Sequence, residues 1–268
     1  MKLLFSASLL ALASPAFAQT QESLYRVYQY ETPLAGWAEP AVWTTYIPRS
    51  DQPYTPFGGG FSRDGLWAHA AELEFGLTDY LSLASYAIFE DPSGGPFRYT
   101  QARVEARYRF AQAYELPVDL AVYAEYYFPR KTYSDEQELE LRVILQKEVE
   151  DFRIVLNPVA SFATSGEQSG ESPDISLHAG VYYRRFSIAQ PGFEIYSDFG
   201  QSGKWKQQRY VAMPVVDLNL GRHVIWELGV GRGFSGPTDR WIVKSILQFE
   251  FDAVRPSRWF RSFVGRLP

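Results

Sequence analysis

A strict alternation of apolar and charged residues is the feature that most constrains how this chain folds. In the stretch YTQARVEARYRF, Tyr99 to Phe110, one parity carries Thr, Ala, Val, Tyr and Phe. The other parity carries polar groups and charges of both signs: Gln101, Arg103, Glu105, Arg107 and Arg109. Successive side chains of a strand point to opposite faces, so one face is apolar and the other is charged. The charged face is the outside of a soluble β-sandwich but the inside of an outer-membrane β-barrel.

The same alternation recurs along the chain and predicts an all-β, antiparallel transmembrane β-barrel of about twelve strands. Most of the segments approach the roughly 9–11 residues that a tilted strand needs to cross a bilayer. The predicted strands are 37–47, 68–78, 80–89, 98–110, 117–128, 137–149, 152–163, 174–186, 192–200, 208–220, 222–233 and 239–251.

The connections between these segments alternate in length, which is typical of outer-membrane barrels. Tight turns are expected at 78–79, 150–151 and 221–222. Longer segments rich in Gly, Pro, Ser and charge lie between them, at 90–97, 129–136, 164–173 and 201–207, and residues 48–65 would form the longest outer loop. An even strand number then predicts that both termini are periplasmic.

A secreted sandwich or lipocalin-like barrel is the alternative, because it also combines alternating strands with export. Its strands usually run about five or six residues, roughly half the length expected here. Its charged face would be hydrated, whereas the mixture of Arg with Glu and Asp suits a closed lumen in which charges must be satisfied. The pattern therefore favours the membrane barrel.

The first eighteen residues have the features of a secretory signal peptide. Lys2 precedes an apolar run, and Ala16, Phe17 and Ala18 form an A-x-A cleavage site. The apolar run is shorter than the roughly 20 residues of a membrane anchor. We therefore divide the chain into a signal peptide (1–18), an N-terminal lead or plug segment (19–36), a transmembrane β-barrel (37–251) and a periplasmic basic-aromatic tail (252–268).

The composition fits export to the cell outer membrane of a Gram-negative bacterium. Aromatic residues make up 16% of the chain, which suits strands and interfacial belts. There is no cysteine, which excludes disulfides, metal thiolates and cysteine nucleophiles. The net charge of −5 makes nucleic acid an unsuitable partner. The expected partners are outer-membrane lipid, lipopolysaccharide and the barrel-assembly machinery, with an unassigned oligomeric state and no cofactor or metal.

The polar parity of the predicted strands identifies candidate lumen-facing residues. They are Glu72, Glu74, Arg103, Glu105, Arg107, Asp119, Glu125, Glu138, Glu140, Arg142, Arg153, Asp174, His178, Glu194, Asp198, Asp217, Glu227 and Lys244. Acids outnumber bases, so an open lumen would favour cations or neutral polar solutes. Alternatively, the charges pair across strands and fill the interior. Twelve strands lie between the roughly eight of filled barrels and the 16 or more of aqueous channels, so strand number leaves both possibilities open.

The histidines offer no convincing catalytic group. Asp174, Ser176 and His178 share a parity, but residues two apart on one strand lie about 6.5 Å apart, too far for a direct Ser to His hydrogen bond. A hydrogen-bonding His178 in the lumen is the preferred interpretation. His69 and His223 suit interfacial positions, and GVGRGF at 229–234 lacks the following helix that a phosphate loop needs. An envelope lipid-modifying enzyme remains an alternative function.

The last predicted strand resembles the C-terminal assembly signal of bacterial outer-membrane barrels. KSILQFEF, Lys244 to Phe251, ends in an aromatic-x-aromatic pattern at Phe249 and Phe251. The resemblance implies recognition by the barrel-insertion machinery. It departs from the usual form, because seventeen further residues follow Phe251.

A second resemblance lies in ELEFGLTDYLSLASYAIF, Glu72 to Phe89. This stretch is similar to the Gly-Leu-Thr-Asp hairpin of a group of poorly characterised barrels described as transporter-like or as phenol-degradation MetA-pathway proteins. Gly76 and Asp79 suit a tight turn with positive φ or an Asx-type hydrogen bond. The resemblance implies a membrane barrel and nothing sharper about its activity.

Taken together, these patterns predict a passive or weakly cation-selective channel for small solutes. A structural barrel with a filled lumen is a further alternative. Residues 19–36 could be an extra strand, a periplasmic lead or a plug in the lumen. The tail carries Arg255, Arg258, Arg261 and Arg266 among aromatic residues, so it would lie at the membrane interface or occlude the acidic lumen from below.

Overall fold

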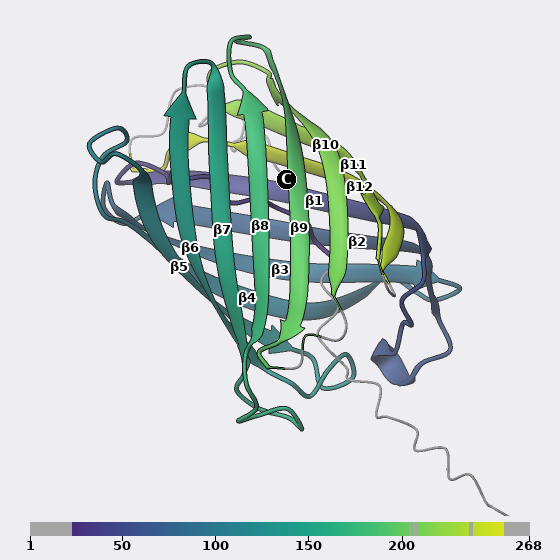
Figure 1. Cartoon of the computed structure of the whole chain (residues 1–268). Helices are drawn as coiled ribbons and strands as arrows, with labels where there is room; N and C mark the ends of the chain where they lie inside the picture. Colours follow the sequence, from purple (N-terminus) through teal and green to yellow (C-terminus); the bar gives the residue numbers. More distant parts are fainter. Residues whose placement is uncertain (1–22, 204, 206–207, 236–237, 255–268) are drawn as a thin grey trace, which may run out of the picture.

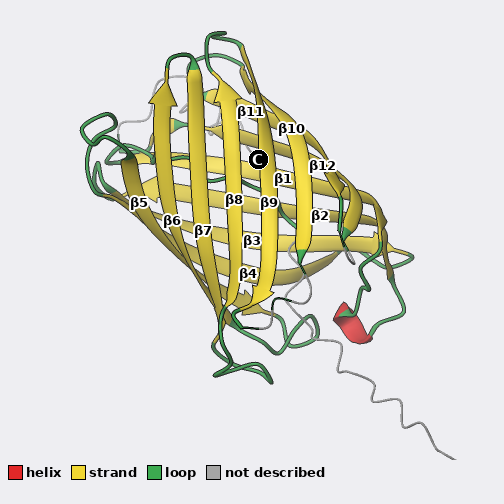
Figure 2. Ribbon diagram, in the orientation of Figure 1, coloured by secondary structure: helices red, strands yellow, loops and turns green. Residues whose placement is uncertain are grey.

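The chain forms a closed barrel of twelve antiparallel strands, in which each strand pairs with its sequence neighbours and β12 pairs back onto β1 (Figure 1; Figure 2). The structure is a computed structural model and describes residues 23–203, 205, 208–235 and 238–254. The strands are β1 Trp37–Ser50, β2 Ser62–Gly76, β3 Leu81–Ser93, β4 Arg98–Arg109, β5 Asp119–Pro129, β6 Glu138–Val149, β7 Phe152–Ala163, β8 Asp174–Tyr183, β9 Ala189–Gln201, β10 Arg209–Asn219, β11 Val224–Gly233 and β12 Asp239–Phe249. A two-residue strand, β13 (Phe251–Asp252), continues β12 and pairs with the start of β1.

Each of the twelve predicted spans overlaps one observed strand, so the predicted fold class and strand number are confirmed. The strands are 10 to 15 residues long, enough for the roughly 9–11 that a bilayer crossing requires. One 3₁₀ turn, η1 (Pro56–Gly58), lies in the loop between β1 and β2 and is red in Figure 2. Within the described residues, no helix has the length and apolarity needed to cross a membrane.

The two ends of the barrel differ in their connections. One end, here called the loop end, carries 51–61, 94–97, 130–137, 164–173, 202–208 and 234–238. The other, here called the turn end, carries 77–80, 110–118, 150–151, 184–188 and 220–223. Strands β6 and β8 run toward the turn end and β7 and β9 toward the loop end (Figure 1).

The predicted alternation of loop lengths is only partly correct. The connection 110–118 at the turn end has nine residues, whereas 94–97 at the loop end has four. Strand β3 continues to Ser93 through the Glu-Asp-Pro-Ser segment that suggested a loop, and β2 begins at Ser62 within the expected first loop. Local Pro and Gly content misled the prediction, because ladder hydrogen bonds to a neighbouring strand can extend a strand through such residues.

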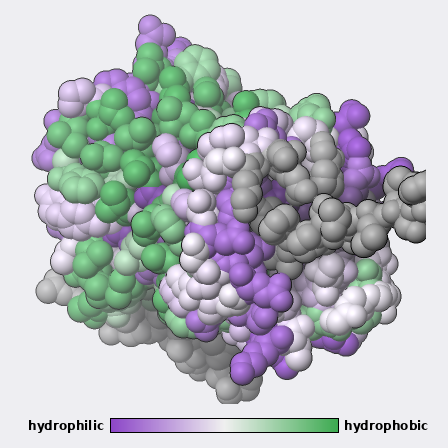
Figure 3. Space-filling model, turned by 60° about the horizontal axis from the view of Figure 1, so that its bottom comes forward, coloured by the Kyte–Doolittle hydropathy of each residue, from purple (hydrophilic) through white to green (hydrophobic). Residues whose placement is uncertain are grey.

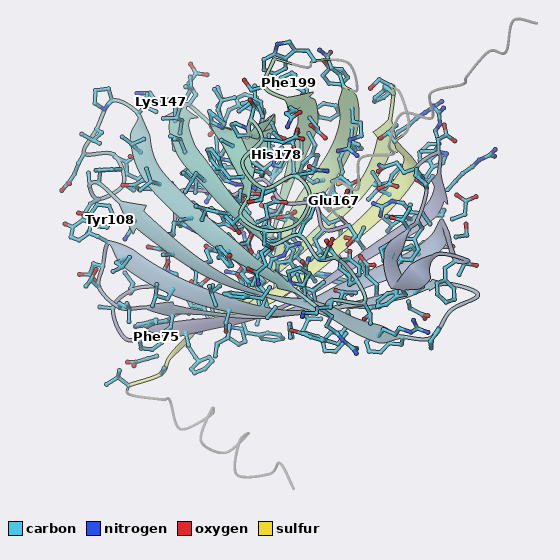
Figure 4. The ribbon with its side chains drawn as sticks, turned by 90° about the horizontal axis from the view of Figure 1, so that it is seen from below. Phe75, Tyr108, Lys147, Glu167, His178 and Phe199 are labelled. Carbon is cyan, nitrogen blue, oxygen red and sulfur yellow. The ribbon has the colours of Figure 1, made fainter. Side chains whose placement is uncertain are left out.

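The two faces of the barrel wall have opposite chemistry. Val104, Leu73 and Val230 are outward-facing and about half exposed, at 47%, 50% and 50%. Hydrophobic side chains gather on the barrel wall in Figure 3, while hydrophilic ones lie toward the loops. In Figure 4, Tyr108 points away from the barrel while His178 lies inside it. This apolar outside and polar inside is the reverse of a soluble protein and is typical of a membrane barrel.

Gly76 has a different role from the one its turn suggested. It is absent from the described residues with positive φ. Instead, a Cβ built on Gly76 would lie 2.2 Å from the carbonyl oxygen of Leu34, so no side chain fits there. The backbone N–H of Gly36 donates to the carbonyl of Gly76 at 2.8 Å. The glycine therefore allows the segment that precedes β1 to pass close to the end of β2.

The predicted signal peptide and most of the predicted tail lie outside the described residues. Ser23, the first described residue, lies at the loop end, and Val254, the last, lies at the turn end beside Gly36. The location of the two termini on one side of a membrane stays a prediction.

Introducing a charge on the lipid-facing side should impair membrane insertion. We expect Val104→Arg to destabilise the inserted barrel by about 2–4 kcal/mol, because an arginine near the bilayer midplane on the lipid face carries that cost. The measurement is the folded fraction on a heat-modifiability gel after refolding into lipid vesicles. Val104→Leu is the matched control and should insert like the parent. Normal insertion of the arginine variant would contradict the assigned parity of β4.

Candidate functional site

The lumen of the barrel brings together the polar residues of all twelve strands. Of the predicted lumen residues, Glu138, Asp174 and Asp198 are partly buried and the others are buried. All three partly buried residues line a cavity near the loop end. On β4 and β6, these buried residues alternate with lipid-facing residues that are partly or fully exposed, as the parity of the strands requires.

The N-terminal segment, defined here as residues 23–36, runs through this lumen in an extended form. The backbone N–H of Tyr28 donates to Asn157 Oδ1 at 2.8 Å, and Asn157 Nδ2 donates to the carbonyl of Tyr28 at 3.0 Å. The N–H of Tyr30 donates to Gln146 Oε1 at 2.9 Å. Side-chain amides of the barrel wall thus satisfy backbone groups of the segment that no neighbouring strand pairs with.

The two ends of the segment are held at opposite ends of the barrel. At the loop end, the Ser23 hydroxyl donates to Glu90 at 2.8 Å and the Tyr25 hydroxyl donates to Asp239 at 2.7 Å. At the turn end, the N–H of Ala35 donates to Asp79 Oδ1 at 3.2 Å. The segment therefore spans the height of the lumen before the chain enters β1.

A first charged cluster lies on the lumen faces of β2, β3 and β4. Arg107 Nη2 lies 2.8 Å from Glu105 Oε1 and 3.6 Å from Glu74 Oε2. The Tyr86 hydroxyl lies between Glu105 and Glu72, and donates to Glu72 at 2.7 Å. Pairing of this kind is required in a water-poor interior, because an isolated buried charge costs several kcal/mol.

The N-terminal segment takes part in this first cluster. Arg26 Nη1 lies 3.5 Å from Glu72 Oε2, and Trp43 Nε1 donates to the same oxygen at 2.6 Å. The Arg26 guanidinium lies over the Trp43 ring, 4.9 Å from its centroid. Burial alone would lower the pKa of Arg26, but the Glu72 carboxylate raises it above its ordinary value. Arg26 therefore remains charged within the barrel.

A second cluster, on β6, β8 and β9, places His178 in a hydrogen-bonding role. Arg142 Nη2 lies 2.7 Å from Glu140 Oε1, and Arg142 Nη1 lies 3.3 Å from His178 Nδ1. The His178 ring packs edge-on against Tyr196 at 5.1 Å between centroids. His178 Nδ1 thus faces the Arg142 guanidinium, and the ring also makes a hydrogen bond to the backbone of Arg26. These contacts fit the hydrogen-bonding role in the lumen that the sequence analysis preferred.

A third cluster joins β9, β11 and β12 around Lys244. Lys244 Nζ lies 2.6 Å from Glu194 Oε2 and also contacts Glu227. The hydroxyls of Tyr182 and Tyr196 donate to Glu194 at 2.7 Å and 2.6 Å. One ammonium group thus neutralises part of the charge of two carboxylates, one on β9 and one on β11.

Two carboxylates at the loop end were missed by the sequence analysis. Asp239 accepts two hydrogen bonds from Arg63, at 2.7 Å and 2.8 Å, and both side chains are fully buried. Glu90 accepts from the hydroxyls of Tyr54 and Tyr133, at 2.8 Å and 3.1 Å. Arg63 and Glu90 fell in segments predicted as loops, so their parity was not considered. Extending the alternation of β3 could have found Glu90, which shares the parity of Tyr86 and Ile88. It would not have found Arg63, because an irregularity in β2 shifts the parity between Ser62 and Trp67.

The tyrosines that bind Glu90 act only as donors. Burial, together with the negative charge of Glu90, raises the pKa of Tyr54 and Tyr133 above the ordinary value. Tyr54 lies in the loop 51–61 and Tyr133 in the loop 130–137. Their hydroxyls therefore stay protonated and tie both loops to the same carboxylate as Ser23.

Two cavities lie in the lumen. The loop-end cavity, about 140 Å³, is lined by Tyr25, Arg103, Asp174 and Asp198 among others. The turn-end cavity, about 430 Å³, is lined by Arg26, Val27, Gln29, Arg109 and Asp217 among others. Tyr25 borders the first and Arg26 borders the second, so the N-terminal segment lies at the boundary of both.

The remaining predicted site residues are placed as follows. Phe249 ends β12 and is partly exposed, and Phe251 lies in β13. Among the tail residues, 252–254 are described and Arg255, Arg258, Arg261 and Arg266 are not. In the part of the chain that the structure covers, no three His, Asp or Glu side chains come together in an arrangement that could hold a metal ion.

The fold is similar to that of known outer-membrane barrels. An outer-membrane channel from Pseudomonas putida F1 matches with a TM-score of 0.61 and 14% identity, over 85% of this chain and 100% of that one. The KdgM porin, in complex with disordered oligogalacturonate, matches with a TM-score of 0.55 and 8% identity, over 79% of this chain and 98% of that one. Outer-membrane phospholipase A from Escherichia coli matches at a TM-score of 0.46, too low to bear on activity.

No family model matches the sequence, and a comparison with curated proteins finds no match. The structural neighbours show that this closed twelve-strand barrel with an apolar outer wall has the fold of outer-membrane β-barrels.

Loosening the N-terminal segment should expose its middle to solvent reagents. Because the chain has no cysteine, Val27→Cys introduces a unique thiol at a buried position of the segment. In that background we expect Asn157→Ala to raise the maleimide labelling rate roughly 30-fold, since two hydrogen bonds worth about 1 kcal/mol each are lost. Asn219→Ala, at the turn end, is the control and should leave the rate unchanged. Equal labelling in all three proteins would refute the anchoring role of Asn157.

Proposed function

We propose that the protein is a passive, weakly cation-selective outer-membrane channel for small solutes. The observation that carries the proposal is a lumen that holds many polar and charged side chains and has a cavity toward each end. Between the cavities lies one extended segment, which is hydrogen-bonded to the wall and packed against buried apolar and aromatic side chains. The fold shared with an outer-membrane channel and a porin supports the same role.

The charge of the wall supports a preference for cations. Acids outnumber bases among the lumen residues, and Asp239 and Glu90 add to the buried acids. Most of these carboxylates meet an arginine, a lysine or a tyrosine hydroxyl, so the selectivity arises from the remaining excess of negative charge rather than from isolated carboxylates. A modest excess corresponds to weak selectivity, because paired charges contribute little field beyond their own neighbours.

The N-terminal segment favours a second candidate, a structural barrel with a filled lumen. Its residues Tyr28 and Tyr30 are buried in the middle of the barrel and bonded to the wall on several strands. If the segment never leaves, solutes cannot pass. The two candidates therefore differ in whether the segment moves.

We further propose a relationship to the transporter-like, phenol-degradation MetA-pathway barrels. The Gly-Leu-Thr-Asp hairpin at 76–79 supports it, because Gly76 and Asp79 both contact the N-terminal segment here. In this proposal the loop end faces outward, the turn end faces the periplasm, and Phe249 and Phe251 serve as the signal for the assembly machinery. Lipopolysaccharide would contact the outer wall near the loops.

Conductance measurements test the channel. We expect the refolded mature chain, residues 19–268, to give discrete steps in a planar bilayer. A potassium chloride gradient should give a reversal potential on the cation side, because of the excess of lumen acids. An inserted, heat-modifiable barrel that stays silent would favour the filled structural barrel. Anion selectivity would refute the role assigned to the acids.

Two deletions test which of the flanking segments, if either, blocks the lumen. Removing residues 19–30 should raise single-channel conductance several-fold, because it empties the middle of the lumen of Tyr28 and Tyr30 while keeping the contacts of 33–36 with Gly76. Removing 253–268 is the matched deletion at the other end and tests whether the tail occludes the lumen. Unchanged conductance after the first deletion would show that the segment does not limit flow.

A further inference from the structure

The turn-end cavity has walls of opposite charge. Arg109 on β4 lines one side, Asp217 on β10 and Glu227 on β11 line the other, and Arg153 on β7 lies between the two sides. Strands β4 and β10 are six strands apart in a ring of twelve, so Arg109 and Asp217 lie on opposite sides of the lumen. All four residues are more than nine-tenths buried within the barrel. A field therefore runs across the cavity rather than along it.

The two opposed residues each carry a polar atom with no hydrogen-bond partner in the described part of the chain. These atoms are the donor Arg109 Nε and the acceptor Asp217 Oδ1. Within the same residues, neither side chain belongs to an ion pair: Arg109 donates to the carbonyl of Asp79 and lies over the Tyr30 ring, 5.4 Å from its centroid. An unmatched buried donor and an unmatched buried acceptor each cost about 1–3 kcal/mol. A ligand with an acceptor at one end and a donor at the other would satisfy both.

The chain itself places a dipolar group between these walls. Arg153 Nη1 donates to the side-chain oxygen of Gln29 in the N-terminal segment. The side chain of Gln29 also makes a hydrogen bond with Asp217, in which the carboxylate accepts from the amide N–H₂. The amide thus has its carbonyl toward the arginine wall and its N–H₂ toward the acidic wall. The Gln29 side-chain amide is therefore oriented as the electric field across the cavity would orient any small dipole.

The other charges at the cavity are largely neutralised by their own neighbours. Arg153 also pairs with Glu31 and Glu148, and Glu227 contacts Lys244. Arg107 pairs with Glu105 and Glu74. Arg184, Arg222 and His223 lie in the turns at the mouth and are partly or fully exposed, where solvent screens them. Gln248 donates to Glu39, and Glu250 lies 3.9 Å from His223 at the mouth. Arg109 and Asp217 are therefore the opposed buried charges that no ion pair of the described residues neutralises.

We propose that the turn-end cavity binds small zwitterionic solutes that carry a carboxylate and an ammonium group. The carboxylate would lie against Arg109, and the ammonium group against Asp217 beside Glu227. The cavity volume of about 430 Å³ falls in the range of small-ligand pockets, roughly 300–1,000 Å³. The inference rests on the proposed function, since it names the class of solute that the channel would pass.

Three probes of equal carbon-chain length test the proposal: 4-aminobutyrate, butyrate and n-butylammonium. Isothermal titration of the full mature chain, refolded in detergent, should give a Kd for 4-aminobutyrate at least tenfold lower than for either singly charged probe. Asp217→Asn should weaken binding of 4-aminobutyrate about tenfold. Asp174→Asn, the same substitution in the loop-end cavity, is the matched control and should leave the Kd unchanged.

Gln29→Ala provides a second variant, which changes no barrel strand. It removes the amide that occupies the field, so 4-aminobutyrate should bind several-fold more tightly. A heat-modifiability gel establishes that each variant is folded. If Asp217→Asn does not fold, the affinity of the Gln29→Ala variant for 4-aminobutyrate tests the proposal. Equal binding of the three probes, no binding, or a folded Asp217→Asn barrel with unchanged affinity would each overturn the proposal.

Conductance of the same preparations separates this proposal from the channel itself. A barrel that conducts ions but binds no zwitterion would remove the solute class and leave the channel. A barrel that binds 4-aminobutyrate but never conducts, even without residues 19–30, would remove the channel and leave the binding site.

Discussion

The structure depends on one constraint: in a bilayer, every backbone N–H and C=O must be paired within the protein. A sheet meets this requirement only when it closes on itself, and the β12 to β1 pairing supplies the closure. Closure divides each strand into a lipid face and a lumen face. The lipid face must then be apolar, so the polar residues of twelve strands are forced into one small interior.

That interior imposes a second requirement, because charges removed from water need partners. Arg63 with Asp239, and Lys244 with Glu194, are fully buried pairs with short contacts. Tyrosine hydroxyls take part throughout the lumen, as at Glu90 and Glu194, since a phenol donates to a carboxylate without adding charge. The wall is therefore a set of paired clusters, with a few polar atoms left over at the turn-end cavity.

The extended N-terminal segment follows from the same chemistry. An extended chain offers backbone groups that need partners, and the wall offers amides such as Asn157 and Gln146. The segment divides the lumen into two cavities and contributes Arg26 and Gln29 to the charge balance of the wall. In the proposed channel, solute passage would depend on the hydrogen bonds that hold this segment, and Arg109 and Asp217 would set the polarity of the turn-end cavity that the segment borders.

The twelve strands, their parity and most of the lumen residues were accessible from the sequence, since period-two alternation is a local property that lipid on one side enforces. The start of β2 and the end of β3 were harder to predict from the sequence, because pairing with a neighbouring strand extended these strands through Gly and Pro residues.

The sequence could not predict which lumen residues pair with one another. Arg63 and Asp239 are separated by 176 residues, and Arg109 and Asp217 lie on strands that meet only across a closed ring. The role of Gly76 likewise came from a segment 40 residues away in the sequence passing its backbone. The alternating pattern of the sequence identifies the lumen face of each strand. Which charges pair there depends on barrel closure and strand register, because these, and not the local pattern, set the distances across the lumen.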